Sequence, residues 1–158
     1  MSRYHMPGSY LPHDEPMILL DTVVNVTDTQ AVCRVTVDES GALGPFINHQ
    51  GNLPGWYALE LMAQTVGVWS GWHRQQRNEN QISLGMVLGA RELKCALPAF
   101  AHGSQLEITV TLLMQDQRIG SFECAIASAG VTCASGRINT FQPTAEELTT
   151  LFTQGVSS

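Results

Sequence analysis

The chain has 158 residues, of which 44% are hydrophobic and 14% are charged. This composition is typical of a globular protein with a sizeable core, so it argues against disorder and favours one domain spanning residues 1–158. The net charge of −6 argues against a general nucleic-acid binder or membrane binder, because such proteins carry an excess of Lys and Arg.

Two strands and a long helix are expected in the first half. The segment PMILLDTVVNV (16–26) is rich in β-branched residues, and AVCRVTV (31–37) alternates apolar with polar side chains. A loop rich in Gly and Pro follows at 39–55. Residues 56–76 are dominated by Leu, Met, Ala, Gln and Trp, with glycine as their sole turn-forming residue, so they predict a helix.

The second half predicts four more strands, two of them joined to the next by the short connections DQ and AG, which favour hairpins. These strands are expected at 82–95, 105–115, 118–128 and 131–142. Near the C-terminus, Thr144 and Glu147 have the spacing of a capping box and predict a short helix at about 144–153.

This order of elements predicts an α+β hotdog fold, in which a curved antiparallel sheet of about six strands wraps around one long central helix. An apolar helix must be covered on most of its surface, and a curved sheet does this. The core is expected at about 11–143. The open edges of such a sheet favour pairing with a second copy of the chain.

Glu60 is the one charged residue between Glu39 and Arg74, and it falls in the first or second turn of the expected helix. A buried carboxylate is costly unless it is paired or hydrogen-bonded, so its presence suggests a general acid or base. Gln64 follows on the same helix face, where it can hold the carboxyl group or a water. The structural alternative is a carboxylate that faces solvent or pairs with an Arg. These polar residues also argue against a membrane-spanning helix.

Two further candidates precede the helix. Pro54 and Gly55 at its start would expose backbone N–H groups that suit the oxygen of a thioester carbonyl, although they also fit an ordinary helix start. His49 lies in the preceding loop and is a candidate general base, although a lone loop histidine can be incidental.

The remaining reactive side chains have simpler interpretations. Four cysteines show no metal-like spacing and are expected to be free structural thiols, which together with the absence of an apolar N-terminal segment indicates a cytoplasmic protein. Several basic residues cluster in the middle of the chain, as a solvated face or as a docking patch for an acidic partner. They are Arg74, Arg77, Arg91 and Lys94.

Several segments resemble the FabZ-like 3-hydroxyacyl-acyl-carrier-protein dehydratases. LPHDEPMILLDTV (11–23) is similar to the opening of those enzymes, and PGWYALELMAQTVG (54–67) is similar to their central helix motif. Three other segments resemble the ApeP-like branch, which is found with aryl polyene biosynthesis. They are ELMAQTVGVWSGW (60–72), LGARELKC (88–95) and INTFQP (138–143).

The resemblance implies a dehydratase that eliminates water from a 3-hydroxyacyl thioester, with no cofactor besides the phosphopantetheine that carries the substrate. It places Glu60 on the catalytic acidic position and Gly55 on the glycine whose N–H holds the thioester oxygen. Gln64 matches the glutamine one turn further on, and His49 matches the catalytic histidine. The chain continues His-Gln-Gly-Asn where the family has His-Phe-Pro-Gly, so His13 is the reserve candidate.

The resemblance also implies partners. An acyl carrier protein or coenzyme A would deliver the substrate, and His49 and Glu60 would come from opposite subunits of a dimer or larger homo-oligomer. Neither nucleic acid nor a membrane is implied. Two alternatives remain open. A hotdog acyl thioesterase would use the same helix start with the carboxylate activating water, and a non-catalytic chain would complete a heterodimer with a related hotdog protein.

Overall fold

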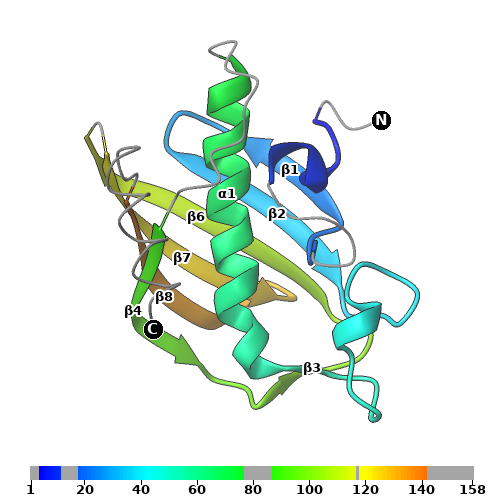
Figure 1. Cartoon of the computed structure of the whole chain (residues 1–158). Helices are drawn as coiled ribbons and strands as arrows, with labels where there is room; N and C mark the ends of the chain where they lie inside the picture. Colours follow the sequence, from blue (N-terminus) through cyan, green and yellow to red (C-terminus); the bar gives the residue numbers. More distant parts are fainter. Residues whose placement is uncertain (1–3, 12–17, 77–86, 117, 142–158) are drawn as a thin grey trace, which may run out of the picture.

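The computed structural model describes residues 4–11, 18–76, 87–116 and 118–141. The helix α1 (Ala58–Gln76) lies against a curved six-stranded antiparallel sheet, which wraps around one side of it (Figure 1). This arrangement confirms the hotdog fold. The strand order is β1-β2-β6-β7-β8-β4. The strands are β1 (Thr22–Val26), β2 (Gln30–Thr36), β4 (Val87–Cys95), β6 (Gln105–Gln115), β7 (Ile119–Ser128) and β8 (Val131–Phe141).

The core lies between the helix and the concave face of the sheet. Strand register places Cys33 opposite Ile108, Ile108 opposite Ile126, and Ile126 opposite Ala134, so one apolar row crosses four strands. All four side chains are buried. The alternating pattern that predicted these strands therefore corresponds to one face against the helix and one face toward solvent.

Two expected boundaries were wrong. The first strand begins at Thr22, because Leu19 and Leu20 are buried in an extended segment outside the sheet. The helix begins at Ala58 rather than at residue 56, because a 3-10 turn, η3 (Gly55–Tyr57), precedes it. The start of the strand expected at 82–95 and the terminal helix expected at 144–153 fall partly or wholly outside the described residues.

Both expected hairpins are present, with β6 pairing with β7 and β7 with β8. In the second one, Ala129 and Gly130 both have positive φ, of 52° and 80°. Two such residues in succession form the turn whose twist matches that of the flanking strands.

Two glycines let the N-terminal segment approach the helix. A Cβ atom on Gly67 would lie 2.6 Å from Leu11 Cδ2, and one on Gly71 would collide with the carbonyl oxygen of Tyr10. Tyr10 closes a short 3-10 turn, η1 (Pro7–Tyr10), which lies across the side of α1 (Figure 1). These two glycines therefore permit the close packing of the N-terminal segment against α1.

A two-stranded sheet fixes the start of the helix. Its strands β3 (Leu53–Pro54) and β5 (Ala99–Phe100) were too short to predict from periodicity. A short 3-10 turn, η2 (Gly44–Phe46), lies in the loop before β3. Among the described helices, none combines the length and the apolar character needed to cross a membrane.

Candidate active site

Glu60 lies in the first turn of α1 and is half-buried rather than fully enclosed. Its Oε1 accepts a hydrogen bond of 3.0 Å from Nε2 of Gln64, one turn further along the helix. The expected contact between these two side chains is therefore present. The amide donor therefore fixes this carboxylate at the helix start, where it is still partly accessible from solvent.

Gln64 is 1% exposed, and both ends of its amide are used. The backbone N–H of Leu19 donates to Gln64 Oε1 at 2.8 Å. Because that oxygen must accept, the amide cannot flip, and Nε2 must be the donor to Glu60. Gln64 thus fixes the position of the Glu60 carboxyl group.

Gly55 lies where two backbones meet. Its N–H donates to the carbonyl oxygen of Pro98 at 2.9 Å. A Cβ atom at Gly55 would lie 2.6 Å from the Leu97 carbonyl oxygen and 3.0 Å from that of Pro98, so a side chain would force the two segments apart. Glycine is needed here for close approach, and its amide already has an acceptor in the single chain. Trp56 supplies the next amide along the chain.

His49 is exposed and lies in a turn beside the helix start. Among the described residues of this single chain, no hydrogen bond or ion pair joins His49 to Glu60. The structure thus brings Glu60, Gln64 and Gly55 to one end of α1, whereas His49 faces solvent on the neighbouring loop. His13 and Arg77 lie outside the described residues.

Exposed apolar side chains surround the helix start. Trp56 is 74% exposed, Leu59 is 36% exposed and Leu97 is 40% exposed. Leu97 lies two residues after the end of β4, a strand on which every described side chain is also exposed. A tryptophan this accessible beside a candidate active site indicates contact with a ligand or with another chain.

The predicted basic cluster is divided in space. Arg91 and Lys94 are both exposed on β4, whereas Arg74 lies in the last turn of α1. Arg91 lies directly opposite Arg137 of β8, which in turn lies opposite Glu123 of β7. Two arginines therefore lie side by side on β4 and β8 at this edge of the sheet.

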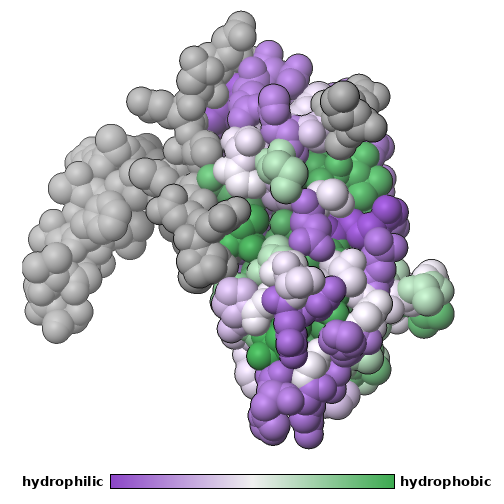
Figure 2. Space-filling model, turned by 90° about the vertical axis from the view of Figure 1, so that its right-hand side faces the viewer, coloured by the Kyte–Doolittle hydropathy of each residue, from purple (hydrophilic) through white to green (hydrophobic). Residues whose placement is uncertain are grey.

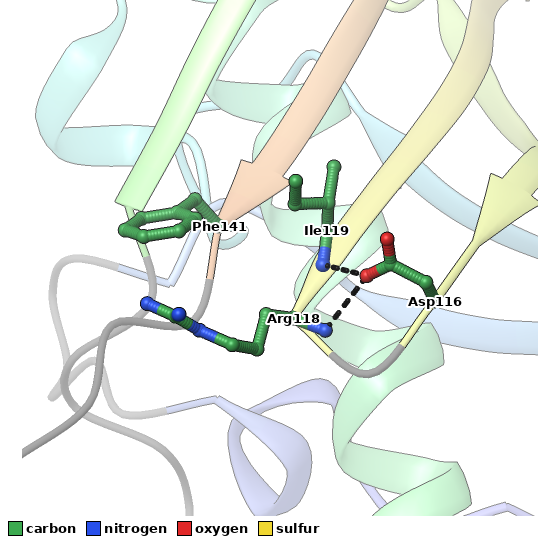
Figure 3. A pocket seen from close by; sticks show the side chains of 4 residues that line it. All are labelled: Asp116, Arg118, Ile119 and Phe141. Atoms are coloured by element: carbon green, nitrogen blue, oxygen red, sulfur yellow. Dashed lines mark hydrogen bonds between the residues drawn. The ribbon is translucent and has the colours of Figure 1, made fainter.

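A separate depression of about 360 Å³ lies at the hairpin between β6 and β7. Asp116, Arg118, Ile119 and Phe141 line it, and the Arg118 guanidinium lies over the Phe141 ring at 4.9 Å from its centre (Figure 3). This hairpin is at the upper left of Figure 1, whereas the start of α1 is at the bottom. The depression is therefore not part of the Glu60 site.

Solved structures that are similar to this chain share its fold. A hypothetical thioesterase protein from Streptococcus pneumoniae solved with coenzyme A has a TM-score of 0.54 at 19% identity, covering 77% of this chain and 84% of its own. At that identity the likeness shows the hotdog fold alone. One chain of the dehydratase heterocomplex ApeI:P from Xenorhabdus doucetiae is much more similar, with a TM-score of 0.88 and 49% identity over 95% of this chain and 99% of its own.

Sequence comparison then identifies the family. The ApeP-like model, described as ApeP dehydratase, matches residues 6–153. The 3-hydroxyacyl-[acyl-carrier-protein] dehydratase FabZ of Bartonella quintana is 32% identical over 133 residues, covering 82% of this chain and 83% of its own. FabZ of Acinetobacter baumannii is 30% identical over 131 residues, covering 82% and 88%. The chain belongs to the ApeP-like dehydratase family.

Proposed function

We propose that this chain catalyses, together with a partner subunit, the elimination of water from a 3-hydroxyacyl thioester to give the trans-2-enoyl thioester. The observation that carries the proposal is the Leu19–Gln64–Glu60 hydrogen-bond chain at the start of α1. It holds one carboxyl group in a fixed orientation within a chain of the dehydratase family. The acyl group is proposed to arrive on the phosphopantetheine arm of an acyl carrier protein, in aryl polyene or fatty-acid-like synthesis.

The proposed reaction needs one base, one acid and one site for negative charge. The imidazole of His49 removes the proton from C2 of the substrate, and the electron pair moves toward the thioester carbonyl oxygen. When the C2–C3 double bond forms, the bond from C3 to the hydroxyl oxygen breaks. Glu60 supplies a proton to that oxygen, which leaves as water. These steps require proton transfer and charge stabilisation only, so no cofactor is invoked.

The thioester oxygen would be stabilised by backbone amides at the start of η3. The resemblance assigned this role to Gly55, whose N–H donates to Pro98 in the single chain. We propose that Trp56, the next residue, supplies the free amide, while Gly55 allows the backbones to approach closely. An amide donor aimed at a developing oxyanion contributes about 10²–10³-fold to the rate of acyl-transfer enzymes.

The site is proposed to be completed by a second hotdog subunit at the β4 edge. Strand β4 pairs with β8 on one side and ends the strand order of the sheet, so its other edge pairs with no strand among the described residues. A strand from a second chain can pair there and bring its own His49 loop, or an equivalent loop, toward Glu60. The similarity to a chain of the ApeI:P heterocomplex favours a related hotdog chain as the partner over a second copy.

The test is the substitution Glu60→Gln, with Glu123→Gln as the control. An amide at position 60 can still accept the hydrogen bond from Gln64, so folding should be retained, but it cannot give a proton to the leaving hydroxyl. Glu123 is an exposed carboxylate on the outer face of the sheet. We expect Glu60→Gln to lower kcat by at least about 10²-fold and Glu123→Gln to have no effect.

The assay should follow the products as well as the rate, with the chain purified alone and with a related hotdog chain. Formation of an enoyl thioester with loss of one water supports the proposal. Release of a free acid and a carrier thiol would identify a thioesterase instead. Full dehydration by the Glu60→Gln variant would refute the assignment of Glu60. Activity that appears only with the second chain would establish the heterodimer.

A further inference from the structure

The turn that carries His49 is organised by one side chain, that of Asn48. Its Oδ1 accepts hydrogen bonds from the backbone N–H groups of Gln50 and Asn52, both at 3.0 Å. The Asn48 carbonyl accepts from Gly51 N at 3.0 Å, and its N–H donates to the Asn52 carbonyl at 2.8 Å. Four hydrogen bonds thus close five residues into a compact turn, with His49 at its tip.

The turn is also fixed to the segment that follows β5. The Asn52 side chain accepts a hydrogen bond of 3.0 Å from the backbone N–H of His102. Gly51 has a φ of 85°, which favours glycine, and a Cβ atom there would lie 3.7 Å from the His102 ring. Since β3 begins at Leu53 and pairs with β5, the turn is joined rigidly to the start of α1.

His49 itself contributes nothing to this construction through its side chain. Its imidazole is exposed, and within the described residues it has no hydrogen-bond or ion-pair partner. The side of the molecule that bears the loop is mainly hydrophilic in its lower part (Figure 2). A structured turn that holds an exposed histidine side chain is suited to present that histidine to a second molecule.

We infer that Asn48 is a positioning residue for the dehydration, because its side chain sets the direction in which His49 points. This inference rests on the proposed function of His49 as the base that meets the substrate at the subunit junction. Residues 49–52 are His-Gln-Gly-Asn, a stretch without proline to stiffen it. The side-chain oxygen of Asn48 supplies the stiffness instead, because it accepts hydrogen bonds from two backbone amides.

The test compares three variants of the turn in the active assembly. Asn48→Ala removes the acceptor of both amides and is expected to lower kcat about 10- to 100-fold with little change in KM, since small displacements of a catalytic group have effects of this size. Asn48→Asp keeps an acceptor oxygen at the same place and should restore most of the activity. Gln50→Ala is the matched control, because this exposed side chain makes no hydrogen bond within the described part of the chain.

His49→Ala is measured in the same series, with a carrier-protein-bound 3-hydroxyacyl thioester as substrate and thermal melting as a check on folding. An inactive His49→Ala variant beside a fully active Asn48→Ala variant would refute the inference and leave the proposed function intact. A fully active His49→Ala variant would refute the role of His49 itself. If Asn48→Asp is as slow as Asn48→Ala at equal Tm, the acceptor oxygen does not position the base and the inference is wrong.

Discussion

Replacing Gln64 by Glu tests the hydrogen-bond chain that joins Leu19, Gln64 and Glu60. A carboxyl group at position 64 can still accept from the Leu19 N–H, but it meets the Glu60 carboxylate where an amide donor now lies at 3.0 Å. Two carboxylates at this separation cannot both be ionised without strong repulsion, so the pair retains one proton to a higher pH than either group would alone.

This shared proton determines how the stability of the Gln64→Glu variant depends on pH. In the folded variant, the pKa of the carboxyl group at position 64 is raised above its unfolded value of about 4.3. The variant is therefore close to the wild type in stability at or below that pH, and it loses stability as the pH rises. Two unit charges 4 Å apart interact by about 4 kcal/mol at an effective dielectric constant of 20. A pKa raised by two to three units corresponds to about 3–4 kcal/mol at pH 7.5.

The measurement is the free energy of unfolding in urea at about pH 4.5 and pH 7.5, with Gln64→Leu for comparison. The Leu variant loses the hydrogen bond and leaves the buried Leu19 N–H without an acceptor, which costs about 2–4 kcal/mol at both pH values. Equal destabilisation of Gln64→Glu at the two pH values would mean that residue 64 does not face the Glu60 carboxylate, and the orientation argued for the acid would be wrong.

Three further expectations concern other parts of the molecule: the backbone contact at Gly55, the reactivity of the thiols and the hydrogen bonds of Asp116. Gly55→Ala should destabilise the protein by about 1–3 kcal/mol in chemical denaturation because its Cβ atom meets the Leu97 and Pro98 carbonyls, whereas Gly89→Ala, with open space at its Cβ, should be neutral. Burial raises the pKa of the Cys33 and Cys124 thiols to about 12, so exposed Cys95 on β4 should be the fast-reacting thiol in a thiol-reagent assay at about pH 8, and pairing at β4 should slow it. Backbone N–H bonds from Arg118 and Ile119 lower the pKa of Asp116, so Asp116→Ala should lower Tm at pH 7 and lose this difference as pH falls below the ordinary value of 3.8. A thiol assay in which Cys33 reacts as fast as Cys95, or an Asp116→Ala variant whose Tm deficit persists in acid, would contradict these two expectations.

The elements that could be predicted from the sequence are those with a repeated local pattern. The alternation in 105–115 and the continuous apolar run after Gly55 each repeat over several turns or pleats, so the sheet and the helix followed directly. The contact between Glu60 and Gln64 was predictable for the same reason, since residues four apart share a helix face.

The features that could not be predicted depend on segments far apart in the chain. The Pro98 carbonyl that occupies the Gly55 amide belongs to a segment beyond β4, and no spacing rule connects the two. The two-residue strands β3 and β5 are too short to show a period. Asn48 carries a local signal, because Asn followed by a glycine three positions later is typical of a turn, but that signal does not show which backbone amides its side chain binds.

The two edge strands of the sheet, β1 and β4, differ in whether a side chain already binds the outer edge of the strand. At β1, the Tyr4 hydroxyl accepts a hydrogen bond from Val26 N at 3.0 Å and donates to Asn25 Oδ1 at 2.8 Å, so a side chain already occupies that edge. At β4, the described side chains are exposed and the strand ends beside Trp56 and the start of α1. Among the described residues, the β4 edge is therefore the one better suited to pair with a second chain. Under the proposed function, that pairing is also what unites an acid on one subunit with a base on the other, so assembly and catalysis would depend on the same strand.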